Sequence, residues 1–453
     1  MQERQKRSVK QILEDLKTEI RSSQNTLLIA VDIGKMRNCA CFVSSSGKVL
    51  RRRFFFANTI DGFNNLMRQT KFYQNKEKLP ASLFGMEPSG YYWIHLYEYL
   101  DLQEKRVVTV SPLAVNRNRE TINVSKDKLD PKDAYNISDL MRQGKFYFPI
   151  YRDKEIRQLK RFMQIYYRLI TQKASLRCRL RGIVGYIFPE LEHYFRNITA
   201  KSIIIILKNF PSPLQIRKLG KSRFVYFLKQ KNPRLSRRRA EEIYEMARTS
   251  CGITGEEKAV FFEIKLLLSE LRNLEENIAR INTEVQAIVK DREDYQLLLT
   301  IPGIGAVTAS SIIAQIGDIT NFSSGKQLIK LAGLDLYSSE SGISVHTLRH
   351  ISKRGRKVLR TVLYQATVAC IKCNAHLKAC YLKLLANQPN KKKVKPKAIV
   401  AIACKLLRII YRMLTEKKAF DFSYDEKLKR KFSSRETETI SIEKLDLLQP
   451  LVC

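Results

Sequence analysis

The order of apolar and polar positions divides the chain into a mixed α/β part and a longer helical part. In residues 25–150, short apolar runs bounded by turn residues predict strands, and stretches of helical periodicity predict the helices between them. The predicted strands are residues 26–32, 38–43, 48–56, 82–86 and 107–110. The predicted helices are residues 1–24, 60–69, 91–100 and 130–141. The fold class that we predict is therefore α/β followed by all-α.

Residues 151–292 predict helices only, including a strongly basic pair over residues 221–248 that is broken at Asn232 and Pro233. The clearest periodicity follows, where apolar residues recur in alternating steps of four and three. These residues are Val260, Ile264, Leu267, Leu271, Leu274, Ile278, Ile281, Val285 and Ile288. Four heptads kept in step predict a coiled coil, which can pair within one chain or between chains. Pairing between chains is the favoured interpretation.

The C-terminal region, residues 293–417, begins with a glycine turn between two apolar helices. Thr300 is followed by Ile-Pro-Gly-Ile-Gly, a pattern similar to a helix-hairpin-helix. In that motif, glycines such as Gly303 and Gly305 let backbone amides approach a phosphate of a nucleic acid. A packing turn between helices explains the same glycines equally well. Residues 418–453 predict a charged tail.

Composition indicates a polyanionic partner. The chain has 453 residues and a formal net charge of +38, from 82 Lys and Arg against 44 Asp and Glu. An excess spread over the whole length points most simply to nucleic acid. With 44% hydrophobic residues the chain can also bury real cores, which excludes a disordered basic protein. No stretch predicts a membrane span or a signal peptide, so we expect a cytoplasmic protein whose nine cysteines are free thiols.

A Ser-rich loop that contains Ser341 and Gly342 leads directly into a dense basic run. A serine hydroxyl becomes a nucleophile only when its surroundings activate it, and clustered cations suit a phosphate that gains charge under attack. The loop therefore predicts a serine nucleophile for DNA phosphodiesters. A turn followed by phosphate contacts explains it too. The bases of the run that we expect to bind nucleic acid are Arg349, Lys353, Arg354, Arg356 and Lys357.

Four acids form a second group. Asp32 and Glu87 end two predicted strands, and Asp130 and Asp133 lie one turn apart on a predicted helix. Carboxylates that converge in this way can hold a divalent metal through oxygen ligands. The alternative is local, because Asp130 and Asp133 also suit the N-cap and capping-box positions of their helix. The order of strand Asp, strand Glu and helix Asp-Asp is the one that a ribonuclease-H-like nuclease fold requires.

Together these motifs resemble the DEDD transposases of the insertion-sequence-110 family. The acids stand in Val-Asp-Ile-Gly-Lys, in Met-Glu-Pro-Ser-Gly and in Leu-Asp-Pro-Lys-Asp. The similarity continues through Thr-Ile-Pro-Gly-Ile-Gly, Leu-Ala-Gly-Leu, the Ser341-Gly342 pair and His-Ile-Ser-Lys-Arg-Gly-Arg, and it covers residues 26–414. There are departures from the family pattern. Leu336 stands where many relatives have proline, and Ser338, Ser339 and Ser344 lie close to the expected nucleophile.

The resemblance implies an RNase-H-like domain of the Holliday-resolvase (RuvC) type over residues 25–150, preceded by a basic helix over residues 1–24. A helical coiled-coil region over residues 151–292 and a mainly helical transposase domain over residues 293–417 would follow. Mg²⁺, or Mn²⁺ in its place, would be held by Asp32, Glu87, Asp130 and Asp133, and Ser341 would attack DNA. The implied partners are double-stranded donor and target DNA, a structured non-coding guide RNA (bridge RNA) and further copies of the chain, in a dimer or tetramer.

Other interpretations of the same residues stay open. A Piv-type DNA invertase shares these motifs, a metal-dependent junction nuclease would use only the acids, and a nucleic-acid scaffold would use neither group. A zinc site is a further alternative, because residues 370–380 have zinc-knuckle content in Cys370, Cys373, His376 and Cys380. Residues 358–385 predict one continuous helix, however, and a four-ligand site needs a chain that folds back. Buried cysteines on a helix are the preferred interpretation.

Overall fold

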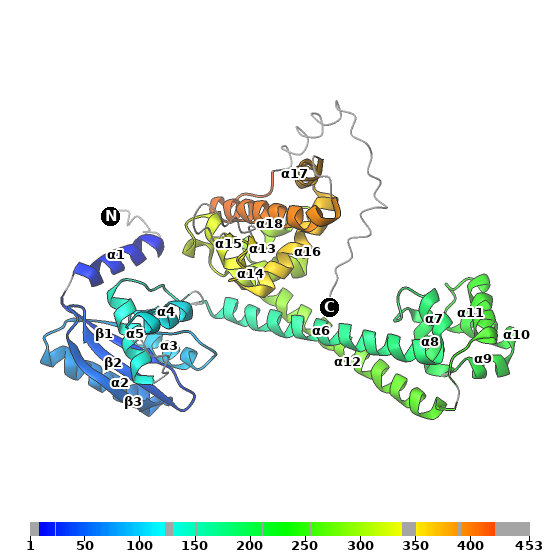
Figure 1. The fold of residues 1–453 in the computed structure, drawn as a ribbon, viewed down its shortest axis with the longest axis horizontal. Coiled ribbons are helices and arrows are strands. Elements are labelled where there is room, and N and C mark those ends of the chain that lie inside the picture. The colour runs from blue at the N-terminus through cyan, green and yellow to red at the C-terminus, as the bar shows by residue number, and fades with distance from the viewer. Residues whose placement is uncertain are drawn as a thin grey trace, which may run out of the picture. The chain divides into compact units, whose positions relative to one another are not determined.

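The computed structural model describes residues 9–22, 24–122, 130–149, 153–210, 212–253, 255–337, 350–386 and 391–421. The chain divides into two compact units (Figure 1). Unit 1 consists of Met1–Asp153, Ile316–Gly355 and Cys404–Glu416, and unit 2 consists of Lys154–Gln315, Arg356–Ala403 and Lys417–Cys453. In the part of the chain that is described, no helix is long and apolar enough to cross a membrane.

A five-stranded sheet forms the centre of unit 1. Its strands follow the order β3-β2-β1-β4-β5. The strands β1, β2 and β3 are antiparallel neighbours, whereas β4 and β5 run parallel to β1. The near-continuous apolar run of β1 is explained by its central position, where both faces of the strand are covered. The bounds are β1 Thr26–Asp32, β2 Arg37–Ser44, β3 Val49–Ala57, β4 Ala81–Met86 and β5 Val107–Thr109.

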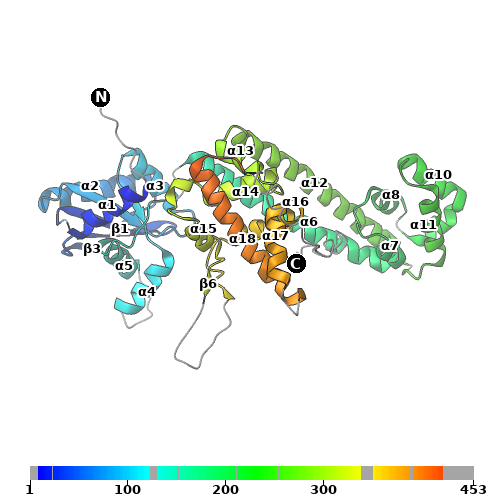
Figure 2. The ribbon, with the colours of Figure 1, turned by 90° about the horizontal axis from the view of Figure 1, so that it is seen from above.

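Helices cover both faces of the sheet, so this part of unit 1 has three layers (Figure 2). The helices α2 (Ile60–Lys76) and α3 (Trp93–Leu102) pack on one face. The helices α1 (Val9–Ser22), α4 (Pro112–Ile122) and α5 (Asp130–Arg142) pack on the other. Each face has its own apolar core, and residues that alternate along β1 contribute to one core or the other.

The five strands confirm the predicted mixed α/β region. The helix at the N-terminus differs from expectation in its place, because Leu16 and Ile20 of α1 are buried in the same core as β1 and α5. It is therefore part of the sheet domain and not a separate basic helix. The helix α4 was not predicted, since its sequence is short and mostly polar.

The rest of unit 1 centres on the short helix α15 (Gly325–Ala332). The 3₁₀ turn η1 (Ile319–Asn321) precedes it, and a two-stranded antiparallel ribbon of β6 (Leu336–Tyr337) and β7 (His350–Ile351) follows it. The last part of α18 (Lys391–Glu416) also belongs here. The Tyr411 hydroxyl donates a hydrogen bond to the Phe322 carbonyl at 3.3 Å, which ties α18 to the segment before α15.

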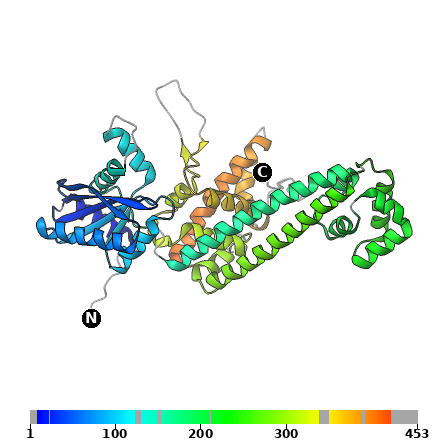
Figure 3. The same ribbon diagram turned by 90° about the horizontal axis from the view of Figure 1, so that it is seen from below.

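Two long helices run side by side in unit 2, α6 (Lys154–Ile187) and α12 (Glu257–Val289) (Figure 3). Leu180 and Val184 of α6 share one core with Ile264 and Leu267 of α12. The buried part of the heptad pattern on α12 therefore packs against another helix of the same chain. At these positions α12 packs on α6 of the same chain, which is the less favoured of the two pairings that the sequence left open.

Five shorter helices pack around the adjoining ends of α6 and α12 and complete the same core. We call this part of unit 2 the α7–α11 bundle. It contains α7 Pro189–Tyr194, α8 Lys201–Asn209, α9 Pro213–Leu219, α10 Lys221–Lys231 and α11 Arg237–Thr249. The remaining helices of unit 2 are α13 Glu293–Leu299, α14 Ala306–Ile316, α16 Lys357–Cys373, α17 Ala375–Ala386 and the first part of α18.

Candidate active site

Asp32 and Glu87 lie at the same edge of the sheet. Asp32 is the last residue of β1, and Glu87 follows the last residue of β4. The two strands are parallel neighbours, with Val31 opposite Met86, so the next residues along both strands emerge side by side. Both side chains are half-buried, and the Ser89 hydroxyl donates a hydrogen bond to Glu87 at 2.5 Å. The sheet therefore brings together the two acids that the sequence predicted for strand ends.

Asp133 lies near the start of α5, the helix that packs on β1 and β2. The first turns of α5 pack on β2, where Ala134 lies in one apolar cluster with Cys39 and Cys41. Cys39 is the residue of β2 that pairs with Asp32. Asp133 precedes Ala134 and is only 4% exposed. Cys41 is fully buried in this contact, and burial raises the pKa of its thiol to about 12.

The fourth predicted acid, Asp130, is the first residue of α5, and its side chain lies outside the described residues. Within the residues that are described, no three His, Cys, Asp or Glu side chains form a group that could hold a metal ion. The three described acids thus lie on adjoining elements without forming a closed cluster. Asp130 lies one turn before Asp133 in the sequence of α5.

Asn136 is a polar side chain that sequence reasoning missed. It lies one turn after Asp133 on α5 and is 0% exposed, yet its amide nitrogen and oxygen have no hydrogen-bond partner among the described residues. Leaving a buried amide unsatisfied costs about 1–3 kcal/mol. We therefore expect this amide to have a hydrogen-bond partner that the described residues do not include. The sequence signal was available, because Asn136 continues the three-residue spacing of Asp130 and Asp133 on a helix whose neighbours are apolar.

Ser341 and Gly342 lie outside the described residues, as do Ser338, Ser339 and Arg349. What the structure describes is the base of the segment that carries them. In the ribbon, Leu336 pairs with Ile351 and Tyr337 with His350. Ser341 therefore belongs to the connection between two antiparallel strands.

The base of this ribbon is built tightly onto the end of α15. Gly333 caps α15 in a left-handed conformation with φ 66°, and Gly355 lies so close that an added Cβ would be 2.3 Å from the Gly333 nitrogen. The Ser352 hydroxyl donates a hydrogen bond of 2.5 Å to Asp335 on the opposite side of the ribbon. These contacts fix where the two strands start. They depend on residues that the sequence pattern did not mark as a pair.

The predicted phosphate-binding bases fall into two settings. Lys353 and Arg354 are exposed, directly after the ribbon. Arg356 is the N-cap of α16 and donates a hydrogen bond to the Gln315 carbonyl, and Lys357 begins the helix. The charge of Arg356 is also felt at Lys160 of α6, whose pKa is lowered to about 7 by burial and by that guanidinium. Arg356 thus has a structural role, and its binding of nucleic acid stays a prediction.

The glycine turn between α13 and α14 has a packing explanation for one of its two glycines. Gly303 has φ 96°, and an added Cβ would lie 2.6 Å from the backbone nitrogen of Cys370 in α16. No side chain fits between these backbones. Around Gly305, by contrast, an added Cβ would meet no atom within 4 Å. Binding of a phosphate by Gly303 and Gly305 stays a prediction.

The segment with zinc-knuckle content departs from the prediction of one continuous helix. The chain breaks at Asn374, where α16 ends and α17 begins. The Asn374 side chain caps α17 by accepting a hydrogen bond of 3.0 Å from the Leu377 nitrogen. Cys370 is buried, Cys373 is exposed, and the Cys380 sulfur is 3.9 Å from His376 Nε2. The described part of the chain holds no group of three such ligands here.

Comparison with known proteins gives two matches to family models. Residues 29–189 match a model described as a transposase of the DEDD type, and residues 295–382 match one described as Transposase IS116/IS110/IS902 family. The first span contains Asp32, Glu87, Asp130 and Asp133, and the second contains Ser341. Residues 190–294 lie between the two matches.

Three relatives illustrate the range of similarity. A protein of insertion element IS116 from Streptomyces clavuligerus is 23% identical over 86% of this chain and 95% of its own length. The transposase for insertion sequence element IS1111A of Coxiella burnetii is 34% identical over 40% of this chain and 50% of its own length. The pilin gene-inverting protein of Moraxella bovis is 30% identical over 33% of this chain and 47% of its own length.

Proposed function

Because the chain belongs to the IS116/IS110/IS902 family of transposases and is a DNA transposase, we propose that it cuts and rejoins DNA through a phosphoserine intermediate at Ser341. Asp32, Glu87, Asp130 and Asp133 form the second half of its active site. The observation that supports the proposal is that the parallel neighbours β1 and β4 place Asp32 and Glu87 at the same edge of the sheet. Two antiparallel strands beside parallel β1, β4 and β5 are also the arrangement of a ribonuclease-H-like nuclease of the RuvC type.

The chemistry assigned to Ser341 is an exchange of phosphate esters. The serine oxygen forms a bond to phosphorus, the bond from phosphorus to one DNA oxygen breaks, and that strand leaves as a free hydroxyl after taking up the proton of the serine. The ester keeps the energy of the phosphodiester bond. Reversal with a different strand hydroxyl therefore rejoins the ends without an external energy source. The flanking bases Lys353, Arg354 and Lys357 would hold the phosphate and offset its developing charge.

The acid set fits a hard divalent cation, for which we propose Mg²⁺, with Mn²⁺ as a substitute. Carboxylate oxygens are the ligands that such a cation prefers, and a bound cation would stabilise negative charge on the phosphate and the leaving oxygen. Like charges that lie close together repel, so the acids need a positive partner to remain ionised together. The unsatisfied amide of Asn136 beside Asp133 supports the same interpretation, since it offers one more oxygen.

A structured guide RNA and assembly into a dimer or tetramer complete the proposal. The net charge of +38 exceeds what a single short DNA contact needs, which supports a second nucleic acid. In such an assembly, the serine of one subunit and the acids of another would form composite sites. Sequencing of the RNA that copurifies with the protein tests the first point, and sedimentation of the complex tests the second.

A DNA invertase is the second candidate, because the pilin gene-inverting protein is among the relatives. A junction nuclease that uses only the acids and a non-catalytic scaffold differ more strongly, since neither forms a covalent bond to DNA. Transposition and inversion are distinguished by sequencing the products made from the DNA that flanks the gene. An invertase would leave one segment reversed in place.

Trapping of the covalent intermediate decides whether Ser341 is the nucleophile. We expect wild-type protein, incubated with the flanking DNA, its copurifying RNA and Mg²⁺ and then denatured, to carry DNA on Ser341. Ser341→Ala should keep RNA and DNA binding, which depend on many Lys and Arg contacts, and yield neither adduct nor recombinant. Ser338→Ala and Ser339→Ala are matched controls that should retain both. An adduct on another serine would overturn the assignment, and hydrolysis without any adduct would favour the nuclease.

A further inference from the structure

The α7–α11 bundle lies outside both family models and still forms part of a well-packed core. Apart from the first residue of α7, it falls in residues 190–294, between the two matched segments. Phe224 and Leu228 of α10 are fully buried together with Ile203 of α8 and Ile243 of α11. The bundle shares its core with α6, which the first model includes, but its own five helices fall almost entirely outside both models, so we look for a role of their own.

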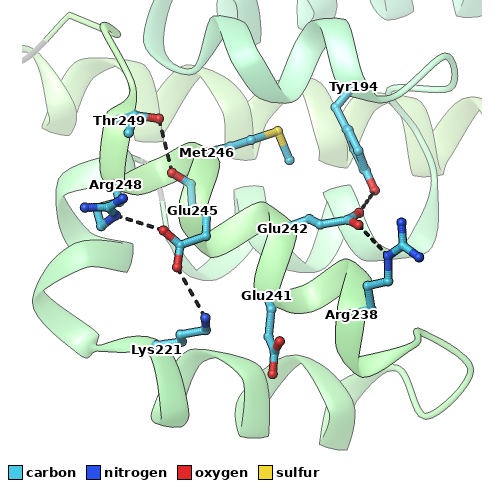
Figure 4. Close-up of a pocket in the computed structure, with 9 residues that line it drawn as sticks. All are labelled: Tyr194, Lys221, Arg238, Glu241, Glu242, Glu245, Met246, Arg248 and Thr249. Atoms are coloured by element: carbon cyan, nitrogen blue, oxygen red, sulfur yellow. Dashed lines mark hydrogen bonds and ion pairs between the residues drawn. The ribbon is translucent and has the colours of Figure 1, made fainter.

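The charge of this segment is one-sided. Residues 193–240 contain thirteen Lys and Arg and no Asp or Glu. Three acids of α11, Glu241, Glu242 and Glu245, line a surface hollow of about 570 Å³ together with Lys221, Arg238 and Arg248 (Figure 4). Glu245 accepts hydrogen bonds from Arg248 at 2.8 Å and Lys221 at 3.3 Å. Glu242 accepts one from Arg238 at 2.9 Å and another from the Tyr194 hydroxyl. On α11, charge is therefore balanced within the bundle.

The outer face of α10 has no such balance. Arg223, Tyr226 and Gln230 follow each other at helical spacing and are exposed, opposite the buried side of the helix. In the described part of the chain, no ion pair includes Arg223, the following Lys231 or Arg234 in the loop after the helix. Within the described residues, this face therefore presents positive charge that no ion pair offsets.

Tyr226 is the unusual member of this face. Its side chain is 66% exposed, and the Gln230 amide donates a hydrogen bond of 2.6 Å to its hydroxyl. That hydrogen bond holds the ring along the helix surface, one turn before Gln230. Arg223 precedes Tyr226 in the sequence, and Lys231 follows it. An exposed aromatic ring with Lys and Arg side chains close to it in the sequence suits unpaired nucleobases, which stack on the ring while the cations hold phosphates. A duplex would offer only its phosphates, because its bases are stacked and paired.

We propose that the α10 face, with Tyr226 at its centre, binds an unpaired stretch of RNA. The choice of RNA rests on the proposed guide RNA, and it has a physical reason. Folded RNA presents unpaired loop bases permanently, whereas the DNA of a transposase is a duplex except while its strands are exchanged. Tyr226 stacks on a base, and Arg223 and Lys231 contact the adjoining phosphates. The bundle is thus an RNA-binding accessory of the transposase.

Affinity measurements on the full chain test the proposal directly. The probes are a fluorescent RNA hairpin with an oligouridine loop, a blunt RNA duplex of the same length and a DNA hairpin with an oligothymidine loop. Tyr226→Ala should weaken binding of the RNA hairpin roughly fivefold to a hundredfold, the range expected for one lost base stack. Tyr226→Phe should keep most of the affinity. Arg223→Ala should weaken the hairpin and the duplex alike and lower the dependence of affinity on salt, by about one contact.

Two controls match these variants. Phe262 on α12 is an aromatic residue of similar exposure, at 72%, and Phe262→Ala should bind every probe as wild type does. Arg272 on the same helix is ion-paired with Glu276, and Arg272→Ala should change affinity less than Arg223→Ala. Both residues lie on exposed surface, so unfolding does not complicate the comparison. Ultraviolet crosslinking of the RNA hairpin should map to the peptide that contains Tyr226.

The outcomes separate this inference from the proposed catalytic function. Wild-type affinity of Tyr226→Ala for the RNA hairpin, or an equal loss for hairpin and duplex, would overturn the stacking role. Binding of the DNA hairpin as tightly as the RNA hairpin, with the same loss in Tyr226→Ala, would overturn the assignment to RNA. None of these results depends on strand cleavage. A failure of Ser341 to form an adduct leaves them unchanged.

Discussion

The acid edge of the sheet and the outer face of α10 carry charges of opposite sign in different arrangements. At the sheet edge, β1, β4 and α5 bring carboxylates together, so that like charges lie on adjoining elements. On α10, cations spread along an exposed helix face with no acid in the surrounding sequence. Gathered acids need a compact positive partner, whereas spread bases suit an extended negative one. Under the two proposals above, closely packed charge forms the catalytic site and spread charge forms the binding surface.

The largest expected effect concerns the acid edge. Asp133→Asn removes one charge without changing the size of the side chain, and we expect Mg²⁺-dependent strand cleavage to fall by orders of magnitude while RNA binding stays. Asp139→Asn, on the same helix, is the control and should cleave nearly as wild type does. Wild-type cleavage by Asp133→Asn would mean that the acids only cap α5, and the contrast with α10 would disappear.

A thiol probe reports whether the variant keeps its fold. Cys41 is buried against the first turns of α5 and has a raised pKa, so it should resist alkylation in the native protein. Cys178 and Cys251 are exposed and should react first. If Asp133→Asn leaves Cys41 protected, a loss of cleavage is chemical and not a result of α5 leaving the sheet.

The next effect concerns the apolar core that α6, α12 and the α7–α11 bundle share. Leu267→Ala opens a cavity between α12 and α6, and it should lower the free energy of unfolding of unit 2 by about 2–5 kcal/mol. The neighbouring Leu266 is 48% exposed, and Leu266→Ala should change it by less than about 0.5 kcal/mol. Urea unfolding followed by far-ultraviolet circular dichroism measures both. Since the seam pairs within the chain, neither variant should change the sedimenting mass.

The smallest effect concerns the balanced charges of α11. Hydrogen bonds from Tyr194 and Arg238 lower the pKa of Glu242, so its carboxylate stabilises the folded state above the ordinary pKa of a glutamate. That contribution disappears as the pH falls through the lowered pKa. The urea midpoint should therefore drop less between pH 6 and pH 3 in Glu242→Gln than in wild type. Glu284→Gln, at an exposed position outside the ion pairs of the described residues, should follow wild type.

Most of the sheet could be predicted from the sequence, but fewer of the helices and helix ends around it could. Apolar runs such as that of β1 predict buried strands because both faces are covered, and the five strands agree with the structure to within two residues. The helix α4 was missed because a short polar helix leaves no periodic signal. The break at Asn374 was missed as well, since a capping asparagine without Gly or Pro resembles a helix interior.

The candidate site was predictable in its residue types more than in its contacts. Strand-end position identified Asp32 and Glu87, and helical spacing identified Asp130 and Asp133. Partners far apart in the sequence, such as Ser352 with Asp335, had no signal, because a single hydrogen bond across a ribbon leaves no pattern. The same limit applied to the heptads, where periodicity showed that α12 needs a partner but could not say that α6 supplies it.

The chain enters and leaves the α7–α11 bundle at two neighbouring points. The Ile253 nitrogen donates to the Tyr186 carbonyl at 3.4 Å, and the Tyr186 hydroxyl donates to Glu256 at 3.1 Å, so the incoming and outgoing segments touch. Everything between them is one closed excursion of the chain, joined to α6 and α12 by the apolar core that they share. Substitutions on the outer face of α10 can therefore change what the bundle binds while every residue of the sheet stays as it is.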